Sequence, residues 1–393
     1  MAGALTTIKA LCAEQGSPFL ELAYDDGDME VPRRRLGAAE PLALSAAYVC
    51  AGQLNDVQVL DHTNIVTKDG RVVFHLQSSQ NINEMGLKEF QAFVAERGAT
   101  FFQSYVEEEC IHIGGMWTDR SNGDWYHLNN APNFGHFIFE FPNRLACFEP
   151  FGIVGKLPVI VYEELPERWL GFIEMMGVPR HLIRRVPIVN PPAYRKAWVS
   201  SCCHYRDTKG VFRFWAAGLH WLRFKTFASI GGAPIHRRRR IYAGREGAKF
   251  RKIVNEDAVK AVLADFGFEF PLLGSMSARE QVETIAGAEI VVYAAGASCV
   301  LAHFAPEHCT TLLLAPRNIG TGFWGGVGSA LVLRQVYERV DCDLVETPGV
   351  VRLNMYGNNE LADFRVDVDL MRAGVEMCLQ RLQNAQRRDA LAL

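Results

Sequence analysis

The sequence is poor in the features that mark secreted, membrane-spanning and nucleic-acid-binding proteins. Its 41 basic and 44 acidic residues leave a formal net charge of −3, whereas a dedicated nucleic-acid binder carries a basic domain. The longest apolar run, residues 290–302, is well short of the ~20 residues that a membrane-spanning helix needs. Because the first residues lack a basic segment followed by a long apolar one, we expect no secretory signal and a cytoplasmic protein.

The cysteines do not follow the spacing of a metal site or of a disulfide framework. The 10 cysteines among 393 residues form no Cys-x-x-Cys pair, so we expect reduced thiols buried as small apolar side chains. Hydrophobic residues make up 49% of the chain and charged residues 22%, as in ordinary globular proteins. The chain is long for one compact core, and its length suits two domains.

Several common catalytic motifs are also missing. The chain has no Gly-x-Gly-x-x-Gly after a strand, no P-loop motif and no His-Glu-x-x-His, which excludes the usual dinucleotide, P-loop and zinc-protease signatures. His112 and His127 lie in one stretch with Asp119 and Asp124, but not at zinc-ligand spacing. The two aspartates are typical of a turn. The glycine-rich stretch 323–330 predicts a loop, either flexible or closing over a ligand.

The first half of the chain alternates between strand and helix patterns. Residues 57–76 contain two alternating stretches around a Lys-Asp-Gly turn, which is typical of a hairpin. Strand patterns within 157–165 and 183–202 enclose a helical pattern at 166–177 that stops at Gly177. This order predicts βαβ units and a parallel sheet.

A second alternation follows the Gly-Gly-Ala-Pro turn at 231–234. We expect Asn255 to be the N-cap of one helix, with acidic residues in its first turn, and Ser277 with Glu280 to form the capping box of the next. The tail predicts an amphipathic helix with a basic end. The predicted strands of this half are 239–244, 268–273, 289–294 and 309–316, and the predicted helices are 255–267, 277–288, 298–306 and 367–390.

These patterns predict an α/β fold with two domains and a boundary near residues 205–235. We expect an N-terminal α/β domain with a β-rich start at 1–205 and a C-terminal α/β domain at 206–340. The remaining residues, 341–393, would form a C-terminal segment that contains the amphipathic helix.

Two loops of the second half suit phosphate groups. Arg245 and Arg251 flank a connection between a strand and a helix start, where arginine forks and the helix dipole can meet phosphate oxygens. Gly296, Ala297 and Ser298 stand in a second such connection, and small residues let a phosphate approach backbone N–H groups. Both loops would lie at one sheet edge, which favours a shared anionic ligand. A solvated basic loop and close strand–helix packing explain the same residues without a ligand.

Three segments resemble, in order and spacing, the glycosyltransferase 61 family. They are "NFGHFIFEFPNRL" at 133–145, "GREGAKFRKIVNEDAVKAVLADFGFEF" at 244–270 and "LGSMSAREQVETIAGAEIVVYAAGASCVLAHFAP" at 273–306. The likeness covers about residues 129–306, and residues 1–110 and 340–393 carry none.

The resemblance implies a GT-B-like arrangement, in which two Rossmann-like α/β domains face a cleft. The N-terminal domain would be the acceptor side and the C-terminal domain the nucleotide-sugar side. It also implies an inverting, metal-independent transfer from a nucleotide sugar, commonly a UDP-sugar, to a hydroxyl of a glycan or glycoconjugate, as in polysaccharide biosynthesis. No cofactor or metal is then expected, and the partners would be the donor and a glycan or lipid-linked acceptor, not nucleic acid.

Carried over motif by motif, the resemblance also implies particular site residues. The chain departs from the family at Ala295, where the family often has a histidine before Gly-Ala. This change removes a donor-contacting imidazole and leaves room for a different donor or a weakened enzyme. The implied site residues are Asn133, His136 and Arg144 in the first segment, Arg245, Arg251, Asn255 and Glu256 in the second, and Gln281, Gly296 and Ala297 in the third.

An inverting transfer needs a base for the acceptor hydroxyl and positive charge for the leaving diphosphate. Arg245 and Arg251 can supply that charge without a metal. His136 begins a helix in the N-terminal half, and an imidazole's ordinary pKa of about 6.5 suits a base near neutral pH. Glu140 and Arg144 follow at i+4 and i+8, where they could orient the imidazole or meet the sugar.

Other interpretations stay open at this point. His136 can cap or pack its helix without touching substrate, and Asp119 and Asp124 are the reserve candidates for the base. The chain can also be a non-catalytic nucleotide-sugar or glycan-binding protein of the same fold. A third reading is a GT-B-shaped nucleotide-sugar epimerase, which would act with no acceptor present.

Basic residues near the domain boundary and at the chain end predict at most a peripheral contact with the inner face of a membrane. Each basic residue near an anionic surface contributes about 1 kcal/mol. Solvated faces explain the same residues. They are the arginines at 237–240 together with Arg381, Arg387 and Arg388.

Overall fold

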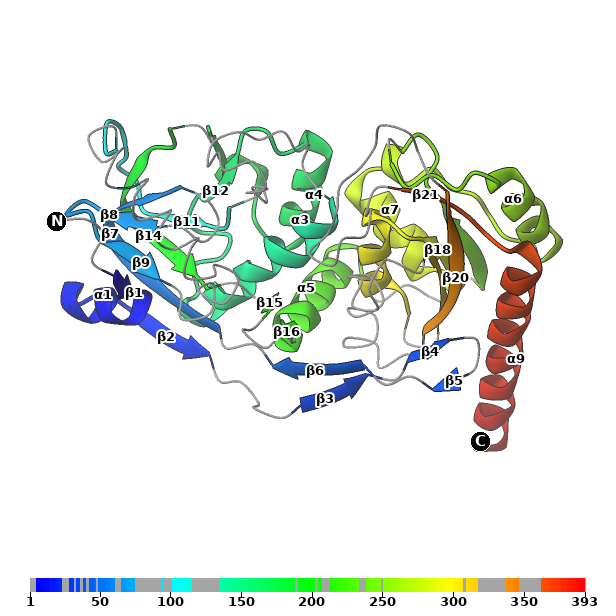
Figure 1. The fold of residues 1–393 in the computed structure, drawn as a ribbon. Helices are drawn as coiled ribbons and strands as arrows, with labels where there is room; N and C mark the ends of the chain where they lie inside the picture. The colour runs from blue at the N-terminus through cyan, green and yellow to red at the C-terminus, as the bar shows by residue number, and fades with distance from the viewer. Residues whose placement is uncertain are drawn as a thin grey trace. The chain divides into compact units, whose positions relative to one another are not determined.

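The computed structural model divides into two compact units, which Figure 1 draws as ribbons. Unit 1 consists of Met1–Met29 and Leu44–Ser229, and unit 2 of Glu30–Ala43 and Ile230–Leu393. The structure describes residues 5–22, 28–31, 33–35, 38–39, 42–46, 49–60, 65–74, 94, 101–114, 134–187, 190–201, 204–206, 212–232, 238–248, 250–306, 309–316, 337–345 and 362–392.

The mixed α/β fold predicted from the sequence is confirmed. The contact boundaries differ from the predicted ones, because residues 206–229 remain with unit 1 and residues 30–43 join unit 2. Residues 341–393 also belong to unit 2. The assignment of an acceptor side and a donor side to these parts stays a prediction.

Unit 1 is built on a ten-stranded mixed sheet. Its strands are β1 (Leu5–Thr7), β2 (Phe19–Leu22), β7 (Val49–Val59), β8 (Ile65–Thr67), β9 (Val72–Phe74), β10 (Tyr105–Val106), β11 (Cys110–His112), β12 (Val159–Tyr162), β13 (Ile183–Val186) and β14 (Ala193–Ser200). Their order is β1-β9-β8-β7-β14-β11-β12-β13, with β10 beside β14 and β2 beside β7. The strands from β14 to β13 pair in parallel, as the alternation predicts, whereas β14, β7, β8 and β9 pair antiparallel.

Helices of unit 1 start and stop where local chemistry predicts. The predicted helix at 166–177 is present as η5 followed by α4, and Gly177 beyond it has a positive φ of 90°. The predicted turn between β8 and β9 is confirmed by the bond from the N–H of Gly70 to the carbonyl of Thr67, 2.9 Å. The helical segments are α1 (Ile8–Gln15), α3 (Phe134–Glu140), η4 (Pro142–Phe151), η5 (Glu167–Trp169), α4 (Leu170–Met175), η6 (Arg180–Leu182) and α5 (Ala216–Ser229).

A four-stranded sheet lies where the chain changes units. Its order is β15-β16-β6-β3. The strands are β15 (His204–Arg206), β16 (Phe212–Phe214), β6 (Leu42–Ala46) and β3 (Asp28–Val31). The chain passes from one unit to the other within β3 and within β6.

Unit 2 is built on a seven-stranded sheet that is parallel at its centre. Its strands are β17 (Arg239–Ala243), β18 (Ala288–Ala294), β19 (Thr310–Pro316), β20 (Tyr337–Val345), β4 (Arg33–Arg35), β5 (Ala38–Ala39) and β21 (Asp363–Arg365), in the order β17-β18-β19-β20-β4-β5 with β21 beside β20. The first five of that order pair in parallel. Both β18 and β19 are buried throughout, as apolar central strands should be.

Two predictions about this half needed local correction. The strand predicted at 268–273 is wrong: only Glu269 forms an isolated bridge, to Ile241, because Pro271 has no N–H with which to continue a ladder. The helix predicted at 298–306 is a 3₁₀-helix, η8 (Ala297–Phe304). The capping box of Ser277 and Glu280 is confirmed at the start of α7 (Ala278–Ala286).

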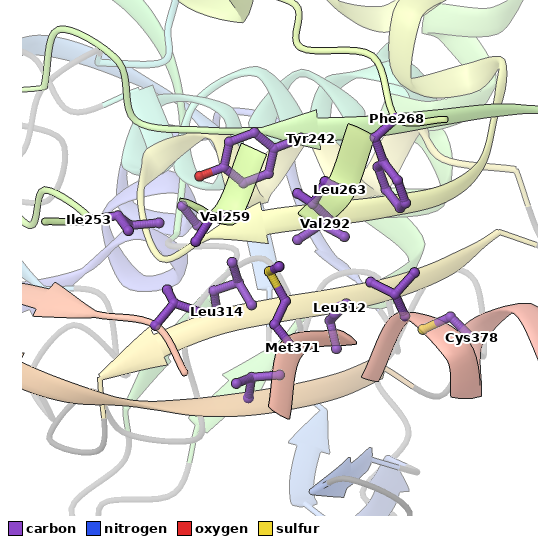
Figure 2. Packing of buried hydrophobic residues seen from close by; sticks show 14 of the residues in the cluster. Tyr242, Ile253, Val259, Leu263, Phe268, Val292, Leu312, Leu314, Met371 and Cys378 are labelled. Atoms are coloured by element: carbon purple, nitrogen blue, oxygen red, sulfur yellow. The ribbon is translucent and has the colours of Figure 1, made fainter. Parts of the chain in front are cut away.

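The core of unit 2 lies between its sheet and two helices, α6 (Glu256–Asp265) and α9 (Val368–Ala392). Figure 2 shows this cluster, with Tyr242 from β17, Val259 from α6 and Met371 from α9. Each large apolar side chain buried here stabilises the unit by about 1.5–3 kcal/mol relative to exposure. The amphipathic character predicted for the tail is confirmed, since α9 buries Met371, Val375, Cys378 and Leu382.

The described part of the chain bears on two expectations, that the cysteines are buried thiols and that no helix crosses a membrane. Its eight cysteines are all buried thiols, which confirms the prediction of small apolar thiols there. Among the helices of these same residues, none has the length and apolarity needed to cross a bilayer.

Candidate functional site

The two loops predicted to bind phosphate come together at the carboxyl edge of the unit 2 sheet. The strands that precede them are adjacent and parallel, with Ala243 of β17 paired to Tyr293 of β18. Arg245 joins the loops, because a Cβ at Gly296 would clash with its Nη1 atom and lie 2.9 Å from its Cζ atom. Gly296 is extended, with φ −175°. The contact therefore needs the missing side chain of glycine and not its conformational freedom.

Among the described residues, the guanidinium of Arg245 donates a hydrogen bond through one of its two terminal nitrogens. Its Nη2 donates to the carbonyl of Phe250 at 2.8 Å, while its Nε is buried and has no hydrogen-bond partner among the described residues. Burial, followed by the positive charge of Arg251, lowers the pKa of Arg245 to about 10. A half-buried guanidinium beside a second cation gains from an anion that can accept from both.

Arg251 has a backbone conformation that favours glycine. Its φ is 55°, and an L-residue in this left-handed region costs roughly 1–2 kcal/mol. Such strain is concentrated at ligand sites. Burial raises the pKa of the Cys299 thiol to about 11, and the charges of Arg245 and Arg251 act in the opposite direction. Arg245 and Arg251 therefore both act electrostatically on the first turn of η8.

The two helix starts at this edge are not equivalent. The first turn of α6 carries Glu256 and Asp257, whereas the first turn of η8 carries no acidic residue. The carboxylates already complement the dipole of α6, so the contribution that we predicted from this helix start is offset. At the start of η8, Ala297 and Ser298 are half-buried and follow Gly296, which adjoins the Arg245 guanidinium, so this helix start is the better placed of the two for an anion.

Asn255 stands before α6 as predicted, but its side chain does not cap the helix. Its Nδ2 donates to the carbonyl of Val366 at 2.8 Å, and the N–H of Val366 donates to its Oδ1 at 3.0 Å. Gln281 similarly donates to the carbonyl of Met276 at 3.0 Å. Both amides therefore fasten parts of unit 2, and the substrate contact predicted for Asn255 stays a prediction.

The loop after β17 is tied to β21, which lies beyond the resembling segments. The N–H of Lys252 donates to Oδ1 of Asp363 at 2.7 Å. The N–H of Phe364 donates to the carbonyl of Lys252 at 2.9 Å, and the N–H of Val254 donates to the carbonyl of Phe364 at 3.0 Å. Sequence reasoning missed Asp363, because no local pattern indicates which distant strand will support a loop.

The first resembling segment is only partly a helix. His136 lies in the first turn of α3, as predicted; its side chain and that of Glu140 are outside the described residues. Arg144 does not continue the helix of His136, because α3 ends at Glu140 and Pro142 begins the 3₁₀-helix η4. Arg144 is only 2% exposed, and its Cζ lies 5.7 Å from the ring centroid of Phe141.

Aromatic packing fixes α3 in unit 1. Phe137 stacks on Trp169, with ring centroids 5.3 Å apart and planes at 26°. Phe134 contacts the same indole at 5.3 Å. Phe137 and Phe141 are almost wholly buried. They support the backbone that carries His136.

Several predicted residues cannot be placed or prove to be structural. Asn133, Asp119 and Asp124 lie outside the described residues, as do His127 and the glycine-rich stretch 323–330. His112 is buried between two aromatic rings, with ring centroids 5.8 Å from Tyr162 and 5.3 Å from Tyr194. Its place in the core agrees with the absence of zinc-ligand spacing.

Acidic triplets of the Asp-x-Asp type occur at two described places in unit 2. In the triplet 341–343, Asp341 accepts from Nε of Arg339 at 2.8 Å. In the triplet 367–369, Oδ1 of Asp367 accepts from the N–H groups of Asp369 and Leu370, each at 3.0 Å. Both contacts are structural: one is an ion pair inside the sheet and the other caps α9. Within the described ranges, His, Cys, Asp and Glu form no group of three or more that could hold a metal ion.

Three arginines named for membrane contact are paired inside unit 2. Arg239 donates to Glu269 at 2.8 Å and Arg240 to Glu289 at 2.9 Å. Arg381 of α9 forms an ion pair with the buried carboxylate of Glu338. Peripheral membrane contact stays a prediction.

An arginine-lined site at the carboxyl edge of a parallel sheet is typical of α/β enzymes that bind phosphorylated ligands. A family model described as Glycosyltransferase 61 matches residues 134–312. The match begins at the first residue of α3 and ends within β19, so it includes both phosphate-suited loops. It confirms the resemblance and supports membership of glycosyltransferase family 61. No curated protein matches the chain.

Proposed function

We propose that the protein transfers a sugar from a nucleotide sugar, a UDP-sugar, to a hydroxyl of a glycan or glycoconjugate acceptor. One observation carries the proposal: the guanidinium of Arg245 fills the space beside Gly296 at the start of η8, and the positive charge of Arg251 acts on that guanidinium. A diphosphate suits this arrangement, because its oxygens can accept from both arginines and from the helix-start N–H groups.

The proposed reaction is a single inverting displacement without a metal. A base removes the proton of the acceptor hydroxyl, and the resulting oxygen attacks the anomeric carbon. The bond from that carbon to the diphosphate breaks, and its electron pair stays on the diphosphate. Arg245 and Arg251 would stabilise this developing negative charge, which is the role that metal ions have in other transferases.

We propose His136 as the base, with Asp119 and Asp124 as reserve candidates. The position of His136 in the first turn of α3, on a backbone held by buried aromatic rings, supports this choice. A positioned acid–base group contributes typically 10²–10⁴-fold. A GT-B-like arrangement of two α/β domains is part of the same proposal.

A thermal-shift panel tests the donor. Wild-type protein is melted with UDP-, GDP-, CMP- and TDP-sugars, since a ligand at 100 times its Kd stabilises the folded state by about 2.7 kcal/mol. We expect UDP and at least one UDP-sugar to raise Tm. If no nucleotide raises Tm, the donor assignment is rejected.

Turnover separates the proposed transferase from the alternatives. A transferase releases UDP from the UDP-sugar only when an acceptor glycan is added. An epimerase interconverts the free nucleotide sugar with no acceptor, and a binding protein turns over neither. The product of the transfer should have the anomeric configuration opposite to that of the donor; retention would contradict the single displacement.

A further inference from the structure

Glu256, the first residue of α6, forms hydrogen bonds with β17 and with the loop that follows β17. Its Oε1 accepts from the hydroxyl of Tyr242 at 3.0 Å and from the backbone N–H of Arg245 at 3.4 Å. A Cβ at Gly244 would lie 2.6 Å from Cε1 of Tyr242 and 2.7 Å from this same Oε1. The carboxylate therefore sits in a space that exists because residue 244 is glycine.

Tyr242 provides a fixed anchor for that carboxylate. It is 1% exposed and belongs to the core cluster of unit 2, as Figure 2 shows. Its ring also meets Phe270 edge-on, with centroids 6.0 Å apart. Burial, with the charge of Glu256, raises the pKa of Tyr242 above its usual value, so its hydroxyl remains a donor at neutral pH. A rigid donor of this kind fixes the position of the acceptor bonded to it.

The chain of contacts ends at the arginine proposed to bind diphosphate. Glu256 accepts from the backbone of Arg245, and its charge favours the protonated form of the Arg245 guanidinium. A carboxylate next to a diphosphate would repel it. Its presence here is consistent with a supporting role and not with a contact to the donor phosphates.

We propose that Glu256 is a positioning residue: bonded to Tyr242, it holds the backbone of Arg245 in the form that binds the donor, and it does not contact the sugar. This inference rests on the proposed function. It replaces the direct substrate contact that the family resemblance implies for Glu256.

The two roles predict different affinities for UDP and for a UDP-sugar. If Glu256 positions Arg245, its loss weakens both ligands by the same factor, because both carry the diphosphate. Tyr242→Phe should then reproduce part of the effect, although Tyr242 touches no ligand. Glu256→Gln should keep most of the affinity for both ligands, because an amide oxygen can still accept both hydrogen bonds. If Glu256 instead contacts the sugar, only the UDP-sugar is weakened, and Tyr242→Phe has no effect.

Calorimetric titration of UDP, and of the UDP-sugar that is turned over, decides between them. We expect Glu256→Ala to weaken both ligands about 10-fold or more and Tyr242→Phe to weaken both about 5-fold. Glu256→Gln should stay within about 3-fold of wild type, because the net loss is then a fraction of one hydrogen bond. Should Glu256→Ala fail to fold, the two conservative variants decide alone.

Two matched controls use the same substitutions nearby. Glu246→Gln changes an exposed carboxylate of the same loop that pairs with Lys260 at 3.1 Å. Tyr293→Phe removes a buried hydroxyl of β18 that has no hydrogen-bond partner among the described residues. Both should bind UDP as wild type does.

Two results would overturn the inference: Tyr242→Phe binding UDP as tightly as wild type, or Glu256→Gln losing affinity for the UDP-sugar alone. Arg245→Ala distinguishes this failure from failure of the proposed function. If Arg245→Ala also binds UDP normally, or wild type binds no UDP, the diphosphate site itself is wrong. If Arg245→Ala loses UDP while Tyr242→Phe keeps it, only the positioning role fails.

Discussion

The guanidinium of Arg245, in the loop after β17, occupies the space that a side chain on Gly296, after β18, would need. The two residues are 51 positions apart by their numbers, yet they interlock because their strands are adjacent and parallel. The contact joins two loops, each suited to phosphate, into one site. It also explains why glycine stands at 296 although its backbone is extended.

Gly296→Ala should therefore weaken donor binding although both arginines are retained. The new methyl group must displace the Arg245 guanidinium, so we expect UDP binding to weaken by about 1.5–3 kcal/mol, the range for charge-assisted hydrogen bonds. Titration calorimetry measures it. Gly274→Ala is the matched control, because a Cβ there meets nothing within 4 Å. Wild-type UDP affinity in Gly296→Ala would refute the interlock.

Substitutions of Arg251 should reveal backbone strain in the loop between β17 and α6. Its φ of 55° is open to glycine but unfavourable for alanine. Arg251→Gly should therefore be more stable than Arg251→Ala by about 1 kcal/mol, and both should lose affinity for UDP. Thermal or urea unfolding without ligand gives the first quantity. Equal stability of the two variants would show that the loop adopts another conformation in solution.

Metal removal should leave the reaction intact. The arginines supply the positive charge that the leaving diphosphate needs, and the described Asp-x-Asp triplets have structural partners. We expect the transfer rate in EDTA to stay close to that in untreated enzyme. A rate lost in EDTA and restored by Mn²⁺ or Mg²⁺ would argue for a metal-assisted leaving group instead.

His136→Ala tests the proposed base. If the imidazole accepts the acceptor's proton, kcat should fall by about 10²–10⁴-fold, while UDP affinity and Tm stay near wild type. A helix-capping role predicts instead a stability loss of roughly 1 kcal/mol with a modest kinetic effect.

Asp119→Asn and Asp124→Asn belong beside it as comparisons. If either abolishes turnover while His136→Ala retains most of it, the base is a carboxylate of the preceding loop. Each variant should be assayed with saturating donor, so that a change in kcat is not confused with donor binding.

Local signals predicted much of this fold. The capping box at Ser277 and the buried run of β18 follow from residues close together in sequence, and both are confirmed. Predictions failed where a proline changed the local backbone: Pro142 begins a 3₁₀-helix after α3, and Pro271 prevents a strand at 268–273. The segment Arg33–Arg35 has no strand pattern, yet it pairs with β20 in unit 2. Such long-range pairing is decided by tertiary context.

The candidate site shows the same division. Arg245 and Gly296 could be placed together from sequence, because the carboxyl ends of neighbouring parallel strands share an edge. The supports could not be predicted. The side-chain amide of Asn255 donates to the carbonyl of Val366, and the N–H of Lys252 donates to Asp363. Val366 and Asp363 belong to a part of the chain that carries no family likeness.

The affinity of Arg245→Ala for UDP tests the central claim most directly. Titration calorimetry on wild type and this variant should be run with Arg279→Ala as control, since Arg279 is an exposed arginine of α7 that pairs with Glu283 at 2.7 Å. We predict that Arg245→Ala binds UDP about 10- to 100-fold more weakly, while Arg279→Ala is unchanged. Equal affinities of wild type and Arg245→Ala would contradict the diphosphate site at the edge of the unit 2 sheet.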